Sequence, residues 1–131
     1  MGGPAAAGQK CERFIGADPM DQRVETVIAF MKVNLHRKLT PDEIAEHVHL
    51  SVARVRQLFK IETGTTLGRY LRHLRLRRAK ELLETTFLTV KEVAARVGIS
   101  GINYLILEFK KAYRMTPARY AARHRKITRQ P

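Results

Sequence analysis

An internal repeat constrains the fold of this chain more than any other feature of its sequence. The segment 39–51, LTPDEIAEHVHLS, returns as the segment 88–100, LTVKEVAARVGIS, at an offset of 49 residues. Gly101 is then inserted, and the matching pairs beyond it, at an offset of 50 residues, are Phe59 with Phe109, Thr66 with Thr116 and Tyr70 with Tyr120. A repeat of this length predicts two similar modules, each built from one supersecondary unit.

Capping residues mark the starts of helices in both copies of the repeat. Thr40 and Thr89 can each accept a hydrogen bond from an N–H group in the first turn of a short helix. Ser51 and Ser100 are each placed to cap the helix that follows. The helix after Ser51 can end at Gly64, because glycine readily adopts the left-handed conformation of a helix C-terminus. A short helix, a brief turn and a second capped helix are the pattern of a helix-turn-helix motif.

Helical signals continue on both sides of the repeated segments. Asp18 and Pro19 predict a helix start, and an apolar stripe with helical spacing follows over residues 24–31. The stretch 67–85 contains no helix breaker in its interior, and Thr116 begins another helix that ends in a basic tail over residues 123–126. Because nothing alternates with the period of a strand, the prediction is an all-α fold of about seven helices.

These signals predict two homeodomain-like helix-turn-helix lobes joined by a long central helix. The expected parts are a flexible N-terminal tail over residues 1–17, a first lobe over 18–66, a connecting helix over 67–86, and a second lobe with its basic C-terminal tail over 87–131.

The charge of the chain favours a polyanionic partner, since 25 lysines and arginines stand against 12 acidic residues and give a formal net charge of +13. Such an excess raises affinity for phosphate-rich surfaces, whether nucleic acid or membrane. Cys11 is the only cysteine, which excludes a disulfide within the chain and fits a reducing cytoplasm. No apolar run approaches the roughly 18 residues of a membrane helix, so we expect no membrane partner.

Nothing in the sequence has the spacing of catalytic or metal-binding residues. There is no glycine loop that could cradle a phosphate, no paired carboxylates and no nucleophile motif, so we expect no enzymatic activity. His47 and His49 lie across a helix end rather than on one face, and no cysteine pair accompanies them. We therefore predict neither a metal site nor a cofactor.

The second helix of the first module, predicted over residues 52–63, has an apolar face and a polar face. Val55, Leu58 and Phe59 have core spacing. The opposite face carries Ala53, Arg54, Arg56, Gln57 and Lys60. Arginine can bond both acceptors of guanine, glutamine can pair with the adenine edge, and alanine leaves room for a thymine methyl group. This face is predicted to read DNA bases, against the alternative of an ordinary solvated helix surface.

The corresponding helix of the second module, predicted over residues 101–113, is more apolar. Leu105 and Phe109 take the core positions. The outward face carries Ile102, Asn103, Ile106 and Leu107. Three interpretations stay open: contact with thymine methyl groups, contact with a protein partner, or deeper burial than the pattern indicates.

Two sets of residues are candidates for contacts with DNA phosphates. Helix N-termini expose backbone N–H groups that can bind phosphate, and they are predicted at Thr40, Ser51, Thr89 and Ser100. Side chains placed to contact the DNA backbone are Arg54, Lys60 and Lys110. The arginines of the long helix, Arg72, Arg75, Arg77 and Arg78, are expected to divide between pairing with Glu81 or Glu84 and reaching phosphate.

These residues resemble the DNA-binding domain of the AraC/XylS family. The matching positions are Ala45, Ser51, Leu58-Phe59-Lys60, Gly64, Tyr70-Leu71, Arg75-Leu76, Ala79, Leu82-Leu83, Val93-Ala94, Val97-Gly98, Tyr104, Phe109-Lys110, Thr116-Pro117 and Tyr120. The resemblance spans about residues 21–125. It implies two recognition helices that enter successive major-groove segments of double-stranded DNA about one helical turn apart. Members regulate transcription, often as activators that contact RNA polymerase.

The resemblance also places the base-reading residues of this sequence. They fall on Ala53, Arg56, Gln57, Ile102, Asn103 and Leu107. Family members commonly have a polar or basic residue where Leu107 stands, and an aromatic residue where Ile99 and Leu105 stand. Many members carry an effector-binding domain as well, so the chain resembles either the stand-alone members or an excised C-terminal domain.

The resulting hypothesis is a cytoplasmic, bacterial, nucleoid-associated regulator that binds DNA as a monomer. The alternative from another class is a protein-interaction module, in which the apolar face formed by Ile102, Ile106 and Leu107 docks a protein partner. RNA binding is a weaker alternative, because the stacking aromatic residues typical of single-strand binders are missing.

Overall fold

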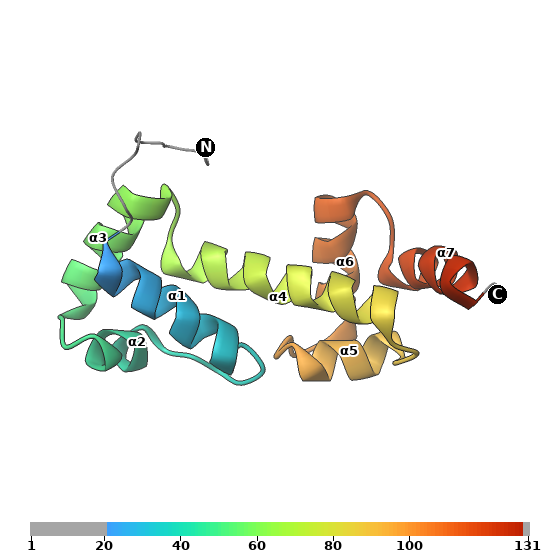
Figure 1. The fold of residues 1–131 in the computed structure, drawn as a ribbon, viewed down its shortest axis with the longest axis horizontal. Helices are drawn as coiled ribbons and strands as arrows, with labels where there is room; N and C mark the ends of the chain where they lie inside the picture. Colours follow the sequence, from blue (N-terminus) through green and yellow to red (C-terminus); the bar gives the residue numbers. More distant parts are fainter. Residues whose placement is uncertain (1–20, 130–131) are drawn as a thin grey trace. The chain divides into compact units, whose positions relative to one another are not determined.

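A computed structural model of the chain describes residues 21–129, with side chains through residue 125. These residues form seven α-helices and contain no strand, which confirms the predicted all-α class (Figure 1). The helices are α1 (Gln22–Asn34), α2 (Pro41–His47), α3 (Val52–Thr63), α4 (Leu67–Thr85), α5 (Val90–Arg96), α6 (Ile102–Tyr113) and α7 (Pro117–Arg129). The predicted start signal at Asp18 and Pro19 lies outside the described residues.

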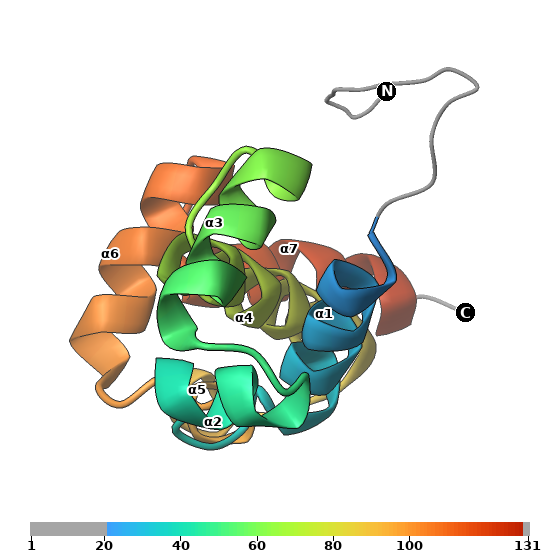
Figure 2. The same ribbon diagram turned by 90° about the vertical axis from the view of Figure 1, so that its left-hand side faces the viewer.

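The described residues form two compact units. Unit 1 comprises residues 21–34 and 39–71, and unit 2 comprises residues 35–38 and 72–129. Helix α4 passes from unit 1 into unit 2 after Leu71, and the connection between α1 and α2 belongs to unit 2. Within unit 1, α2 and α3 lie beside α1 (Figure 2).

Unit 1 buries one face from each of its helices. Its buried residues are Val24, Val27 and Met31 of α1, Ile44 and Ala45 of α2, Val55, Leu58 and Phe59 of α3, and Leu67 and Leu71 of α4. The ring of Phe59 meets the ring of Tyr70 edge-on, with 5.2 Å between the ring centroids. The backbone N–H of Asp21 donates to Glu62 Oε1 at 2.7 Å, so the start of α1 is attached to the end of α3. The described part of helix α1 begins at Gln22.

Unit 2 repeats this packing around a second phenylalanine. Phe109 is fully buried and meets the ring of Tyr120 edge-on at a centroid distance of 5.6 Å. The hydroxyl of Tyr120 donates to the carboxylate of Glu84 on α4. Burial and this carboxylate together raise the pKa of the Tyr120 hydroxyl. Helix α7 extends through Arg129, so the basic residues 123–126 lie on a helix.

Three of the predicted caps are confirmed and one is wrong. Thr40, Ser51 and Thr89 accept hydrogen bonds from the N–H groups three residues later at 3.2, 3.1 and 3.1 Å. Ser100 does not cap α6, because the inserted Gly101 takes that position with φ 113° and no side-chain cap. The insertion moves the helix start one residue beyond the serine, and the positive φ favours glycine there.

Two positions at an offset of 49 residues share a left-handed backbone but differ in their surroundings. His49 has φ 58° and is exposed, whereas Gly98 has φ 77°. A Cβ atom on Gly98 would lie 2.2 Å from the carbonyl oxygen of Leu35 and 2.9 Å from the carbonyl carbon of His36. The connection between α1 and α2 runs against the turn between α5 and α6, so only glycine fits in the second copy.

We expect the substitution Gly98→Ala to lower the free energy of unfolding by about 2–4 kcal/mol, from overpacking plus left-handed strain. Gly64→Ala is the matched control, because Gly64 has φ 79° and a Cβ there would meet nothing within 4 Å. The control should lose only about 1 kcal/mol. Urea unfolding of both variants measures the difference, and equal losses would show that the contact with Leu35 is unimportant.

Candidate nucleic-acid interface

Helix α3 presents the predicted polar face to solvent. Val55, Leu58 and Phe59 are buried, as predicted. The residues on the opposite face, Ala53, Arg54, Arg56, Gln57 and Lys60, are all exposed. The Ser51 cap begins this helix and Gly64 ends it with φ 79° and ψ 3°. Three cations and one amide are thus brought together on one solvent-facing surface of unit 1.

A hydrogen bond orders part of this surface. Arg54 Nη1 donates to Gln57 Oε1 at 2.9 Å, which links two of the candidate DNA contacts. The pKa of the nearby Asp21 carboxyl is lowered chiefly by hydrogen bonds from Arg23. The positive charge of Arg54 lowers it further. Arg54 therefore positions the Gln57 amide in addition to contributing charge.

Helix α6 presents an apolar outer face with the same phase as α3. Leu105 and Phe109 are fully buried, whereas Ile102 is 40% exposed and Leu107 is 55% exposed. Asn103 is exposed and Ile106 is half-buried. Of the three interpretations left open, deep burial is wrong for Ile102 and Leu107, because helical phase turns Leu107 away from Phe109.

Tyr104 is a member of this surface that the sequence analysis did not single out as a site residue. Its side chain is 43% exposed, and it stands at the repeat position of Arg54. The repeat offset of 50 residues was the signal that could have identified it.

The cations of α6 are confined to its C-terminal half. Lys110 and Lys111 are exposed, and Lys111 Nζ lies 3.5 Å from Glu108 Oε2. Lys110 stands at the repeat position of Lys60, so both helices carry a lysine at the same level. The N-terminal half of α6 is uncharged in sequence, unlike the N-terminal half of α3.

Two arginines in the described chain serve the fold. Arg75 Nε donates to the carbonyl of Leu35 at 2.9 Å, and its Nη2 donates to the carbonyl of Arg37 at 2.8 Å. Arg125, 50 residues later, donates in the same way to the carbonyls of Leu83 and Leu88. Burial lowers the pKa of the Arg75 guanidinium. The repeat continues through this pair, so the sequence shows that Arg75 and Arg125 occupy equivalent positions, while their bonds to carbonyls are seen only in the structure.

The other candidate arginines of the long helix are Arg72, Arg77 and Arg78. Arg78 Nη1 lies 3.1 Å from Glu81 Oε1, so the predicted pairing with that carboxylate is confirmed. Glu84, the other predicted partner, instead accepts the hydrogen bond from Tyr120. Arg72 and Arg77 are exposed.

The remaining candidate phosphate contacts lie at helix starts. Thr40 and Thr89 are exposed, and their hydroxyls serve as caps in the way described above. At Thr89 the cap is reciprocal: Glu92 Oε1 accepts the Thr89 N–H at 2.8 Å, which lowers the pKa of the Glu92 carboxyl. Ser100 is exposed beside the start of α6 without capping it.

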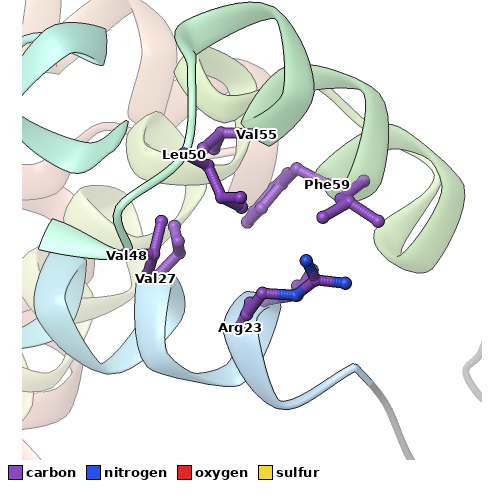
Figure 3. A pocket seen from close by; sticks show the side chains of 8 residues that line it. Arg23, Val27, Val48, Leu50, Val55 and Phe59 are labelled. Carbon is purple, nitrogen blue, oxygen red and sulfur yellow. The ribbon is translucent and has the colours of Figure 1, made fainter. Parts of the chain in front are cut away.

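A hollow in unit 1 belongs to the core. Val27, Val48, Leu50, Val55 and Phe59 point toward it, with Arg23 at one edge (Figure 3). Its cavity volume is about 10 Å³, which is room for at most one water molecule. Ligand pockets commonly enclose about 300–1,000 Å³, so this hollow is an imperfection of packing and the candidate site remains the helix surfaces.

Metal and membrane sites receive no support from the described residues. Among them, no cluster of three or more histidine, cysteine, aspartate or glutamate side chains is arranged to hold a metal ion. None of the helices described combines the length and the apolar character that crossing a bilayer requires.

Comparison with known families identifies the repeated motif. Residues 44–123 match the model of a protein family described as a helix-turn-helix domain. The HTH-type transcriptional activator RhaR of Enterobacter sp. (strain 638) is 34% identical over 110 residues, which are 84% of this chain and 39% of RhaR. The chain thus spans about two fifths of the length of that relative.

Solved structures share the fold. The DNA-binding domain of the global transcriptional factor AdpA, determined in complex with a target DNA, has a TM-score of 0.76 and 28% identity, covering 83% of this chain and 98% of that one. A transcriptional regulator with an AraC-type DNA-binding domain from Chromobacterium violaceum has a TM-score of 0.75 and 26% identity, covering 79% and 92%.

Replacing Arg75 by methionine tests its structural role. The variant Arg75→Met should lose about 2–3 kcal/mol of unfolding free energy, because two charge-assisted hydrogen bonds to carbonyls disappear. Arg72→Met, on the exposed side of the same helix, removes the same charge and should stay within about 0.5 kcal/mol of the parent. A stable Arg75→Met protein with weakened DNA affinity would instead assign Arg75 to phosphate binding.

Leu107→Arg tests the outer face of α6. Because Leu107 is exposed, the melting temperature should barely change, while affinity for duplex DNA of arbitrary sequence should rise if the new charge reaches a phosphate. Leu105→Ala is the contrasting variant and should cost about 2–5 kcal/mol, since Leu105 is fully buried. Thermal unfolding and filter binding measure the two effects. A large drop in the melting temperature of Leu107→Arg would contradict the exposed position of Leu107 on α6.

Proposed function

The chain belongs to the AraC/XylS family of helix-turn-helix proteins, and on that premise we propose that it is a sequence-specific, double-stranded DNA-binding transcription regulator. Helices α3 and α6 act as its recognition helices, each in a major-groove segment. The observation that carries the proposal is the exposed polar and basic face of α3, opposite a buried Phe59. Helix α6 has an exposed face in the same phase, opposite the buried Phe109. A surface of this kind fits the major groove, which admits one α-helix.

The residues of α3 have distinct roles in this proposal. Arg56 bonds the two major-groove acceptors of a guanine, and Gln57 reads an adjacent base. Ala53 leaves space beside it for a thymine methyl group. Lys60 and Arg54 contact phosphate, with Arg54 also orienting Gln57 through the hydrogen bond between them.

The residues of unit 2 act in parallel. Ile102, Asn103 and Leu107 face base edges, and Lys110 contacts phosphate from the position that Lys60 occupies on α3. The helix starts at Thr40, Ser51, Thr89 and Ser100 contribute backbone N–H groups near the DNA backbone. The net charge of +13 supplies the sequence-independent part of the affinity.

The proposal includes partners and location. The protein binds its site as a monomer, contacts RNA polymerase, and acts in the bacterial cytoplasm at the nucleoid, without enzymatic activity. The relatives that share its repeated motif are transcription regulators, including the activator RhaR and the DNA-bound AdpA domain. Docking of a protein on the face formed by Ile102, Ile106 and Leu107 gains no support from them.

Selection from a random duplex library tests the proposal directly. The enriched sequences should contain two short elements about one helical turn of DNA apart, as expected for two recognition helices on one duplex. Binding should weaken steeply with salt, with a log–log slope of about −0.9 for each phosphate contact. Failure to enrich any sequence would overturn the proposed function.

Arg56→Ala should relax the base preference at one guanine and cost about 1–3 kcal/mol of binding free energy on the selected site. Arg78→Ala is the control, because it removes one positive charge from an ion pair with Glu81 on α4 and should leave the preferred sequence unchanged. Repeating the selection with each variant measures both. An unchanged preference at every position with Arg56→Ala would remove Arg56 from base reading.

A further inference from the structure

The outer face of α6 has a chemistry that α3 does not share. Asn103, Leu107 and Lys110 stand at i, i+4 and i+7 and therefore lie on one face of the helix. At the corresponding positions α3 carries Ala53, Gln57 and Lys60. Leu107 therefore stands where α3 has the amide of Gln57, which can donate and accept hydrogen bonds. Leu107 is aliphatic and 55% exposed.

Apolar surface extends around Leu107 along the N-terminal half of α6. Ile102 is 40% exposed, and Ile106 is half-buried at the repeat position of Arg56. The group that would read a guanine in the first copy is therefore absent from the second. No charged side chain of α6 lies before Glu108. A guanine or cytosine edge placed against this half of the helix would lose its hydrogen bonds to water without gaining an equivalent from these aliphatic side chains.

One group on the floor of the major groove suits an aliphatic side chain. The C5 methyl group of thymine is apolar and projects into the groove, whereas the other bases present hydrogen-bonding groups or an unsubstituted edge there. Asn103 adds the complementary preference, because an asparagine amide can bond the N6 and N7 positions of adenine.

Charge on the same helix indicates that the occupant is a polyanion. Lys110 is exposed on the face that holds Leu107, and Lys111 follows it one residue later. An apolar centre beside cations fits a groove whose floor carries methyl groups and whose edges carry phosphates.

We propose that α6 selects A·T base pairs, with Leu107 packed against a thymine C5 methyl group and Asn103 bonded to an adenine edge. This inference rests on the proposed function and adds the base composition of one half of its site. Helix α3, with Arg56, reads the G·C-containing half.

The test removes single methyl groups from the DNA. The selected duplex is resynthesised with each thymine replaced in turn by deoxyuridine, which leaves base pairing and every hydrogen-bonding group intact. At one position in the α6 element the affinity of the parent protein should fall about four-fold, the value of one buried methyl group. The α6 element is the one whose preference does not change with Arg56→Ala.

Leu107→Ala provides the second arm. This variant should bind the thymine and deoxyuridine duplexes equally well at that position, because its side chain no longer reaches the methyl group. Val33→Ala is the control, since Val33 is an equally aliphatic, exposed residue on α1, and its variant should keep the full four-fold discrimination. Melting curves check that all three proteins are folded.

The outcomes separate the two proposals. A selected α6 element rich in G·C pairs, or a deoxyuridine effect that is the same in the parent and in Leu107→Ala, would overturn the inference while leaving DNA binding intact. Absence of any enriched duplex would overturn the proposed function itself, and the inference with it.

Discussion

Each candidate recognition helix depends on one buried phenylalanine. Phe59 and Phe109 are fully buried and each meets a tyrosine ring edge-on, Tyr70 in unit 1 and Tyr120 in unit 2. Because an α-helix turns once every 3.6 residues, anchoring this side chain sets the phase of the whole helix. The residues two positions before and one position after each phenylalanine then face solvent, which places Gln57 and its counterpart in unit 2 on the outer surface.

The two copies of the repeat share their framework and differ where other parts of the chain touch them. Arg75 and Arg125 stand at the same repeat position, and each donates hydrogen bonds to two backbone carbonyls. The carbonyls bound by Arg75 precede α2, and those bound by Arg125 precede α5. His49 and Gly98 share a left-handed conformation, but His49 is exposed, whereas a Cβ atom on Gly98 would meet the backbone of Leu35 and His36. The close approach of residues 35 and 36 to Gly98 lies within unit 2.

In the proposed function, the outer faces of α3 and α6 read different base edges. The face of α3 concentrates cations beside a hydrogen-bonding amide, which is the chemistry that the proposed contacts with guanine and adenine require. The face of α6 places aliphatic side chains where α3 has Arg56 and Gln57, and its cations follow them. A regulator built in this way would read guanine and adenine through unit 1 and the methyl groups of A·T pairs through unit 2.

The repeat, the caps at Thr40, Ser51 and Thr89, and the apolar spacing of α3 were sufficient to predict the helices, the class of fold and the outward residues of α3, because these depend on local hydrogen bonds and helical phase. Local pattern could not reveal that Gly101 displaces Ser100 as a cap, since an inserted residue shifts the helix start only once its backbone conformation is known. The roles of Arg75 and Gly98 and the exposure of Leu107 were decided by tertiary structure alone. Each of them depends on which segment, distant in sequence, does or does not lie against that residue.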